Sequence, residues 1–254
     1  MTDISEPVLL VETTNRVRVL TLNRPQSRNA LSLALSDQFF TALRAAENDH
    51  DVHVVIVTGA DPVFCAGVDL KEIATLPQLP DISPRWPAMS KPVIGAINGA
   101  AVTGGLELAL YCDILIASEH ARFGDTHARV GLLPTWGMSV RLPQKVGVGM
   151  ARRMSMTGDY LSAADALRVG LVTEVVEHGN LLASARRIAE TIADNNQKAV
   201  RALLSSYHRI DESATNDGLC LEAVAARQWR LSASSEDVEA NRQAVLERGR
   251  AQMG

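Results

Sequence analysis

Two segments rich in small residues could place backbone amides against a negatively charged oxygen. Residues 64–69 read FCAGVD, and residues 99–107 read GAAVTGGLE. Each follows an apolar, β-branched run, at 54–57 and 93–97, which predicts a buried strand. We therefore expect the two turns to lie side by side at the ends of neighbouring strands, where two N–H groups would make an oxyanion hole. The second turn opens a predicted helix that carries Glu107 one turn in.

The cysteines and the remaining histidines predict neither a disulfide framework nor a metal site. Cys65, Cys112 and Cys220 are odd in number and form no CxxC pair, so we expect all three to be reduced, with Cys65 a small core filler. Five histidines lack metal-ligand spacing, so no metal is expected; they are His50, His53, His120, His178 and His208.

Composition removes several classes of function. A chain of 254 residues, 46% of them hydrophobic, can bury one large core with a smaller appendage. The net charge is −4 and the basic residues are scattered, so we expect no nucleic-acid partner. No apolar stretch approaches the ~18 residues of a membrane span, and the N-terminus is polar and acidic. These features predict a cytoplasmic protein with no membrane partner.

The elements that must position the two turns alternate between strand and helix. We expect a β-hairpin of strands 8–13 and 17–22, and a helix that Ser32 caps and that runs to Glu47. Further strands are expected at 52–58, 93–98 and 113–118, with a helix over 104–111. This pattern is typical of an α/β fold. Four prolines between 77 and 87 mark a long loop, a candidate substrate lid.

Beyond Val146 the chain becomes mostly helical. A strand is expected at 172–176, and Gly147 is expected to begin a helix. The predicted helices cover 149–156, 163–169, 181–194, 197–207, 214–231 and 238–248. We therefore divide the chain into a core, residues 1–195, and a C-terminal helical part, residues 196–254.

Several motifs together resemble the enoyl-CoA hydratase (crotonase) family over about residues 8–177. They are Asn23-Arg24-Pro25 with Asn29-Ala30-Leu31, the FxAGxD turn, Lys91-Pro92, Asn98-Gly99 leading to Gly104-Gly105-x-Glu107, and Cys112-Asp113-Ile114. Each is weak alone, but their order and spacing are specific. The resemblance implies a spiral of ββα units, a helical C-terminal part that builds homotrimers or homohexamers, and a role in fatty acid metabolism. It also implies a coenzyme A thioester as substrate, bound without a cofactor.

The resemblance implies a site at the two turns. The oxyanion donors would be the amides of Ala66 and Gly104, which suits a thioester because its carbonyl oxygen gains enolate charge during reaction at the adjacent carbons. Trp136 would wall the acyl pocket, or lie simply in the core. Arg28 would meet the phosphates of the coenzyme, or be a solvated loop charge. Other substrate contacts would be Ala30, Gly67, Asp69, Leu70 and Gly105.

One position departs from the family pattern. Hydratases of this family use two glutamates; the first matches Glu107, but the second falls on His127. Paired carboxylates suit water addition because one can deprotonate water while the other protonates the α-carbon. A nearby carboxylate would raise the pKa of His127 and favour an imidazolium. The alternatives are that His127 is a rim residue bonded to Asp125 or a backbone carbonyl, and that Glu107 only stabilises a helix dipole.

Three hypotheses follow. The favoured one is an enoyl-CoA hydratase, with Glu107 and His127 as acid–base groups. The second is a related isomerase or acyl-CoA hydrolase. The third is a non-catalytic acyl-CoA-binding protein. Thr135 stands where dehalogenases and dienoyl isomerases of the family carry an aspartate, and it cannot replace a nucleophilic or basic carboxylate, so those two reactions are disfavoured.

Overall fold

The main sheet of the protein has six strands in the order β1-β2-β3-β4-β6-β9. The structure is a computed structural model that describes residues 6–73, 86–232, 248 and 250. The hairpin strands pair antiparallel, and every other pair in this sheet is parallel. The strands are β1 (Leu9–Thr14), β2 (Val17–Leu22), β3 (Val54–Gly59), β4 (Val93–Ile97), β6 (Ile114–Ser118) and β9 (Glu174–Val176).

The predicted hairpin is confirmed, and its turn has a physical cause. Asn15 and Arg16, the two residues between β1 and β2, have φ values of 51° and 64°. Positive φ at both central residues is the type I′ geometry, whose twist matches that of the flanking strands. The hairpin therefore closes with Thr14 directly opposite Val17.

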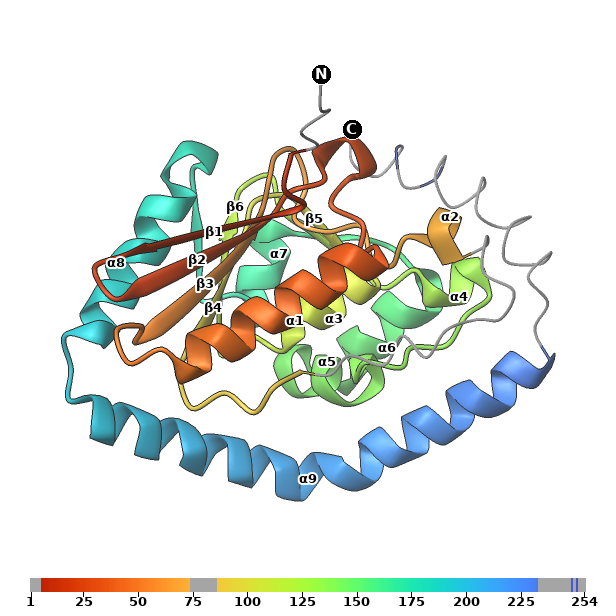
Figure 1. The fold of residues 1–254 in the computed structure, drawn as a ribbon. Coiled ribbons are helices and arrows are strands. Elements are labelled where there is room, and N and C mark those ends of the chain that lie inside the picture. The colour runs from red at the N-terminus through yellow and green to blue at the C-terminus, as the bar shows by residue number, and fades with distance from the viewer. Residues whose placement is uncertain (1–5, 74–85, 233–247, 249, 251–254) are drawn as a thin grey trace.

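Helices cover both faces of the main sheet (Figure 1). In β3, Val54 and Ile56 pack toward α8 (Leu181–Ala193), whereas Val55 and Val57 join the larger core with α1 (Leu33–Asn48) and α3 (Gly104–Leu110). A parallel strand covered on both faces is apolar throughout, as the sequence of β3 predicts. The predicted start of α1 is confirmed, since the Ser32 hydroxyl accepts a hydrogen bond from Leu35 N–H at 3.1 Å.

A second, three-stranded sheet was not predicted. It consists of β5 (Ala100–Val102), β7 (Arg122–Gly124) and β8 (Leu161–Ser162). Strands of two or three residues are too short to show an alternating pattern, so the sequence predicts only a turn followed by a helix over 99–107. β5 follows β4 and directly precedes α3, so its pairing in the small sheet fixes where α3 begins.

The helical second half differs from the prediction at two points. Residues 197–207 and 214–231 belong to one helix, α9 (Gln197–Ser232), because no proline or glycine interrupts 208–213 and the backbone continues despite the weaker apolar pattern. We also missed α5 (Met138–Val146), which contains Pro143, a residue that disfavours helix interiors. The other helical elements are η1 (Pro25–Ser27), α2 (Leu70–Ile73), α4 (His127–Val130), α6 (Val148–Thr157), α7 (Ala163–Arg168) and η2 (His178–Asn180).

Two predicted features lie outside the described residues. These are the helix over 238–248, apart from residue 248, and the candidate lid, apart from Trp86 and Pro87. Gly147 caps the start of α6 with φ of 77°, as expected for a glycine at that position. Among the helices that the structure describes, none combines the length and the apolar character that a membrane crossing needs.

Candidate active site

The two predicted turns lie side by side, as expected. They follow the parallel neighbours β3 and β4, and hydrogen bonds join them: Cys65 N–H donates to Ala100 O, and Val102 N–H to Cys65 O, both at 3.0 Å. The contact is so close that a methyl group on Gly105 would lie 2.1 Å from the Cys65 carbonyl oxygen. A glycine is therefore required where α3 passes the first turn.

The backbone at the second turn adopts an unusual conformation. Thr103 has φ of 47° and ψ of −115°, which a β-branched residue rarely adopts. Its N–H donates to Gly124 O at 2.9 Å, and its hydroxyl leaves no room for a side chain at Gly67, where a methyl group would lie 2.3 Å away. Strained backbone of this kind persists only where its surroundings hold it, and it is common at active sites. Here it precedes Gly104, the first residue of α3.

The two candidate oxyanion donors differ in their present partners. Gly104 N–H belongs to the first turn of α3, where amides have no acceptor within the helix, and the turn and loop hydrogen bonds of the described residues do not use it. Ala66 N–H donates to the Arg28 carbonyl at 3.1 Å. The Gly104 amide is thus available as it stands, whereas the Ala66 amide must share or exchange its bond to hold a ligand.

Glu107 lies one turn into α3 and is almost completely buried, at 2% exposed. Its Oε1 accepts a hydrogen bond from Trp136 N–H at 2.8 Å and a longer one from Met138 N–H at 3.4 Å. Burial raises the pKa of Glu107 to about 7, although the charge of His127 and the Trp136 N–H both lower it. This carboxyl group can therefore both take up and release a proton near neutral pH.

His127, the first residue of α4, lies between two carboxylates. Its Nδ1 is 2.7 Å from Asp125 Oδ1, and its Nε2 is 3.8 Å from Glu107 Oε2. Burial would lower the pKa of His127, but the hydrogen bond to Asp125 and the charge of Glu107 outweigh it, so the pKa lies above its ordinary value. His127 thus makes the expected bond to Asp125 and also faces Glu107, and its catalytic role stays a prediction.

Asp125 is a further candidate site residue, which we predicted only as a possible partner of His127. It is 2% exposed and sits between β7 and α4. Burial would raise its pKa, but hydrogen bonds from the His127 imidazole and from Ser155 hold it below its ordinary value. An ionised Asp125 fixes Nδ1 as a donor and so leaves Nε2 to face Glu107. The signal was the spacing Asp-x-His, in which the acid lies two residues before the imidazole.

Glu222 of α9 was missed altogether. It is 8% exposed, and its two oxygens accept hydrogen bonds of 2.6 Å from Gly137 N–H and Ser139 N–H at the start of α5. Local sequence carries no signal for this contact, since 85 residues separate Glu222 from Gly137.

The predicted substrate contacts surround the first turn. Arg28 is half-buried in a left-handed conformation at the end of η1, with Ala30 two residues on. Leu31 N–H donates to Gly67 O at 2.8 Å. Asp69 forms an ion pair with Arg24 at 2.9 Å that braces this turn, and Leu70 begins α2. Their contacts with a coenzyme stay a prediction.

Trp136 and Cys65 both lie in the interior. Trp136 is 5% exposed and packs in the main core, while its backbone N–H reaches Glu107. Burial raises the pKa of the Cys65 thiol to about 12, so it stays protonated at neutral pH and cannot serve as a nucleophile.

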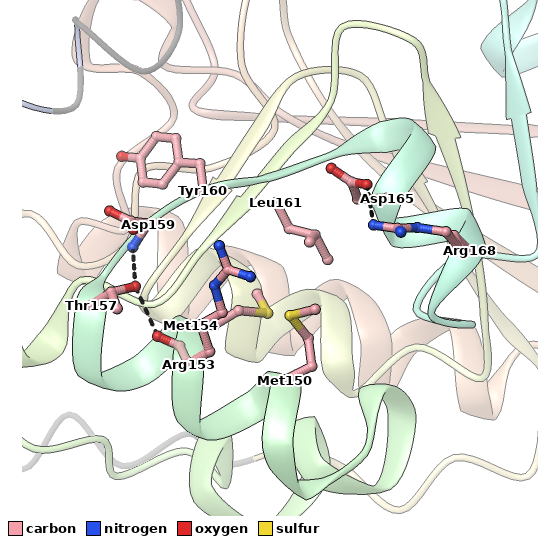
Figure 2. Close-up of a pocket in the computed structure, with 9 residues that line it drawn as sticks. All are labelled: Met150, Arg153, Met154, Thr157, Asp159, Tyr160, Leu161, Asp165 and Arg168. Atoms are coloured by element: carbon pink, nitrogen blue, oxygen red, sulfur yellow. Dashed lines mark hydrogen bonds and ion pairs between the residues drawn. The ribbon is translucent and has the colours of Figure 1, made fainter.

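A separate pocket of about 200 Å³ opens between α6, β8 and α7 (Figure 2). Met150, Met154 and Leu161 give it an apolar floor, and the Asp165–Arg168 ion pair, at 2.6 Å, lies at its edge. Neither Glu107 nor His127 lines it, so this pocket is separate from the candidate site.

Comparison with known proteins shows which proteins this chain is similar to in sequence and fold. The family profile described as "Enoyl-CoA hydratase/isomerase" matches residues 12–253. A probable peroxisomal enoyl-CoA hydratase of Arabidopsis thaliana is 42% identical, covering 81% of this chain and 77% of its own length. The 2,3-dehydroadipyl-CoA hydratase of Escherichia coli is 37% identical, covering 90% and 91%. The crystal structure of an enoyl-CoA hydratase from Mycobacterium tuberculosis is 76% identical with a TM-score of 0.86, covering 89% of this chain and 100% of its own.

Proposed function

The chain belongs to the enoyl-CoA hydratase/isomerase family, and we propose that it is an enoyl-CoA hydratase that adds water across the double bond of a trans-2-enoyl-CoA thioester. One observation carries the proposal. A buried carboxyl group, Glu107, faces the Nε2 of His127 across 3.8 Å, on the helix that begins at the Gly104 amide. This arrangement supports a site with a general base, a general acid and an oxyanion donor close to one another.

The oxyanion hole consists of the amides of Gly104 and Ala66. Attack on the β-carbon of an enoyl thioester pushes an electron pair onto the carbonyl oxygen, which becomes an enolate. An enolate is a stronger acceptor than a neutral carbonyl, so we expect Ala66 N–H to turn from the Arg28 carbonyl, 3.1 Å away, toward the substrate. The N-terminal end of α3 adds its dipole to this stabilisation.

Glu107 and His127 divide the proton transfers between them. Ionised Glu107 takes a proton from water as the oxygen bonds to the β-carbon. The imidazolium of His127 then gives its Nε2 proton to the α-carbon, and the enolate collapses to the saturated thioester. Asp125 Oδ1 accepts a hydrogen bond from Nδ1–H throughout, at 2.7 Å, and so keeps Nε2 directed at the site. Return of one proton from Glu107 to His127 restores the starting state.

The experiment measures loss of the conjugated enoyl-thioester absorbance with short-chain and long-chain substrates. We expect saturable loss in the wild type and a fall of at least about a hundredfold in kcat for Glu107→Gln. The kcat of His127→Ala should also fall steeply. His50 is exposed, so His50→Ala serves as the matched control, and its kcat should equal that of the wild type. Binding without turnover in the wild type would leave an acyl-CoA-binding protein, and release of free thiol would indicate a hydrolase.

We also propose that the protein assembles as a homotrimer or as a hexamer built from trimers. The support lies in α9, which exposes large apolar side chains away from the body of the chain; they include Leu203, Tyr207, Ile210 and Leu221, each more than 60% exposed. Burying such a stripe between subunits would remove it from water. Light scattering coupled to size exclusion tests the assembly, and a stable monomer would contradict it.

A further inference from the structure

Four successive amides at the start of α5 serve two carboxylates in alternation. Trp136 N–H and Met138 N–H donate to Glu107, whereas Gly137 N–H and Ser139 N–H donate to Glu222. The two bonds to Glu222 are short, at 2.6 Å, and the bonds to Glu107 are longer, at 2.8 and 3.4 Å. One turn of backbone thus connects the C-terminal helix with the acid–base site.

The face of α9 that carries Glu222 is docked firmly on this turn. Thr215, Glu222 and Ala226 are buried, at 3%, 8% and 2% exposed, and their spacing puts them on one side of the helix. A methyl group on Gly218 would lie 3.0 Å from Val140 Cγ2, so the two helices are in close contact there. α9 runs beneath α5 in the view of Figure 1.

The same helix also reaches the segment that carries His127. The Trp229 indole N–H donates to Gly131 O at 2.8 Å, and Gly131 terminates α4, the helix that His127 begins. α9 therefore contacts both the segment whose amides donate to Glu107 and the end of the helix that His127 begins. Leu221 and Val224 on its other side stay exposed, at 70% and 50%.

We propose that Glu222 is a positioning residue for Glu107: by holding the amides of Gly137 and Ser139, it sets those of Trp136 and Met138 on the Glu107 carboxylate. This inference rests on the proposed function. Without Glu222 the two amides of 137 and 139 would seek other acceptors, the turn would rotate, and Glu107 would lose the bonds that orient it. Displacements of about 1 Å in such a group can reduce turnover by about a hundredfold.

The charge of Glu222 has a second consequence at the same site. It raises the pKa of Glu107 and of His127, and also that of Tyr111, which lies near Glu107 and Arg141. Among the described residues, those whose pKa responds to the charge of Glu222 are thus Glu107 of α3, Tyr111 just after it and His127 of α4. Arg141 of α5 lies over the Tyr111 ring, 4.2 Å from its centre. Removing one negative charge from this set lowers the pKa of the imidazolium, which a merely structural contact would not do.

The test compares Glu222→Gln with Asp217→Asn, which removes the same charge from an exposed position of α9. We expect Glu222→Gln to lower kcat by about tenfold or more, with KM within about threefold. We also expect the His127 imidazole, followed by NMR in protein labelled at histidine and assigned with His127→Gln, to titrate at lower pH. Asp217→Asn should change neither quantity.

Each outcome decides the matter. An unchanged kcat, or a His127 titration that superposes on the wild type, overturns the proposal. If Glu222→Gln does not fold, Glu222→Asp takes its place: it keeps the charge but cannot span both amides, so kcat should fall, and an unchanged kcat overturns the proposal. The NMR titration needs no turnover, so it separates failure of this inference from failure of the hydratase proposal.

Discussion

Replacing Glu107 with glutamine should stabilise the protein while it lowers kcat by at least about a hundredfold. Glu107 has a pKa of about 7 in the folded chain against 4.5 for an ordinary glutamate, and burial is the main cause. A carboxyl group whose pKa is raised by folding opposes folding once it ionises, so its penalty is absent below about pH 4.5 and complete above about pH 7. At about 1.4 kcal/mol for each pH unit between the two values, the penalty above neutrality is about 3 kcal/mol.

The assay is urea unfolding of the wild type and of Glu107→Gln at fixed protein concentration, at about pH 5 and about pH 8. Glutamine resembles the protonated acid and can accept the Trp136 N–H, 2.8 Å away in the wild type. We therefore expect a gain of about 1 to 3 kcal/mol at the higher pH and nearly none at the lower. The control is Glu12→Gln, since Glu12 is 65% exposed. An equal gain at both pH values, or a loss at pH 8, would refute the reasoning.

Three further predictions follow from the same site. The pH profile of kcat/KM should be bell-shaped. It should fall below about pH 7 as Glu107 gains a proton, and fall again at high pH as His127 loses one. A profile without an acid limb would contradict this. Asp125→Asn should lower kcat by about tenfold to a hundredfold and shift the basic limb of the profile to lower pH, because the imidazolium loses its anionic partner. Steady-state rates measured against pH test this. Gly105→Ala should destabilise the fold by about 3 kcal/mol or more, since the new methyl group would lie 2.1 Å from the Cys65 carbonyl oxygen. Thermal unfolding measures the loss of stability, and a loss under about 1 kcal/mol would count against the packing argument.

Stability and activity make opposite demands on the residues of this site. The fold buries a carboxyl group that would be more stable in water, and it holds Thr103 at φ of 47° beside it. Both features are unfavourable locally, and the packing of α3 against the first turn maintains them. A sequence selected for stability alone would place a neutral acceptor such as glutamine at position 107, which still accepts the Trp136 N–H.

Much of the fold could be predicted because its causes are local. Three kinds of signal act over a few neighbouring positions: the apolar runs of β2 and β3, the Ser32 cap of α1, and the turn residues Asn15 and Arg16. The strands of two or three residues in the second sheet could not be found in this way, because each forms only through pairing with a distant partner.

In the candidate site too, local features were predictable from the sequence and contacts between distant segments were not. The residues by themselves predicted the two small-residue turns and Glu107 one turn into α3, since each of these lies within one strand–turn–helix unit. The resemblance to the family predicted that His127 stands where a second glutamate is expected. Only the tertiary structure decided that His127 lies between Asp125 and Glu107, and that Glu222 shares the start of α5 with Glu107. The reason is physical: distances between side chains on separate elements depend on how those elements pack, and packing is a property of the whole chain.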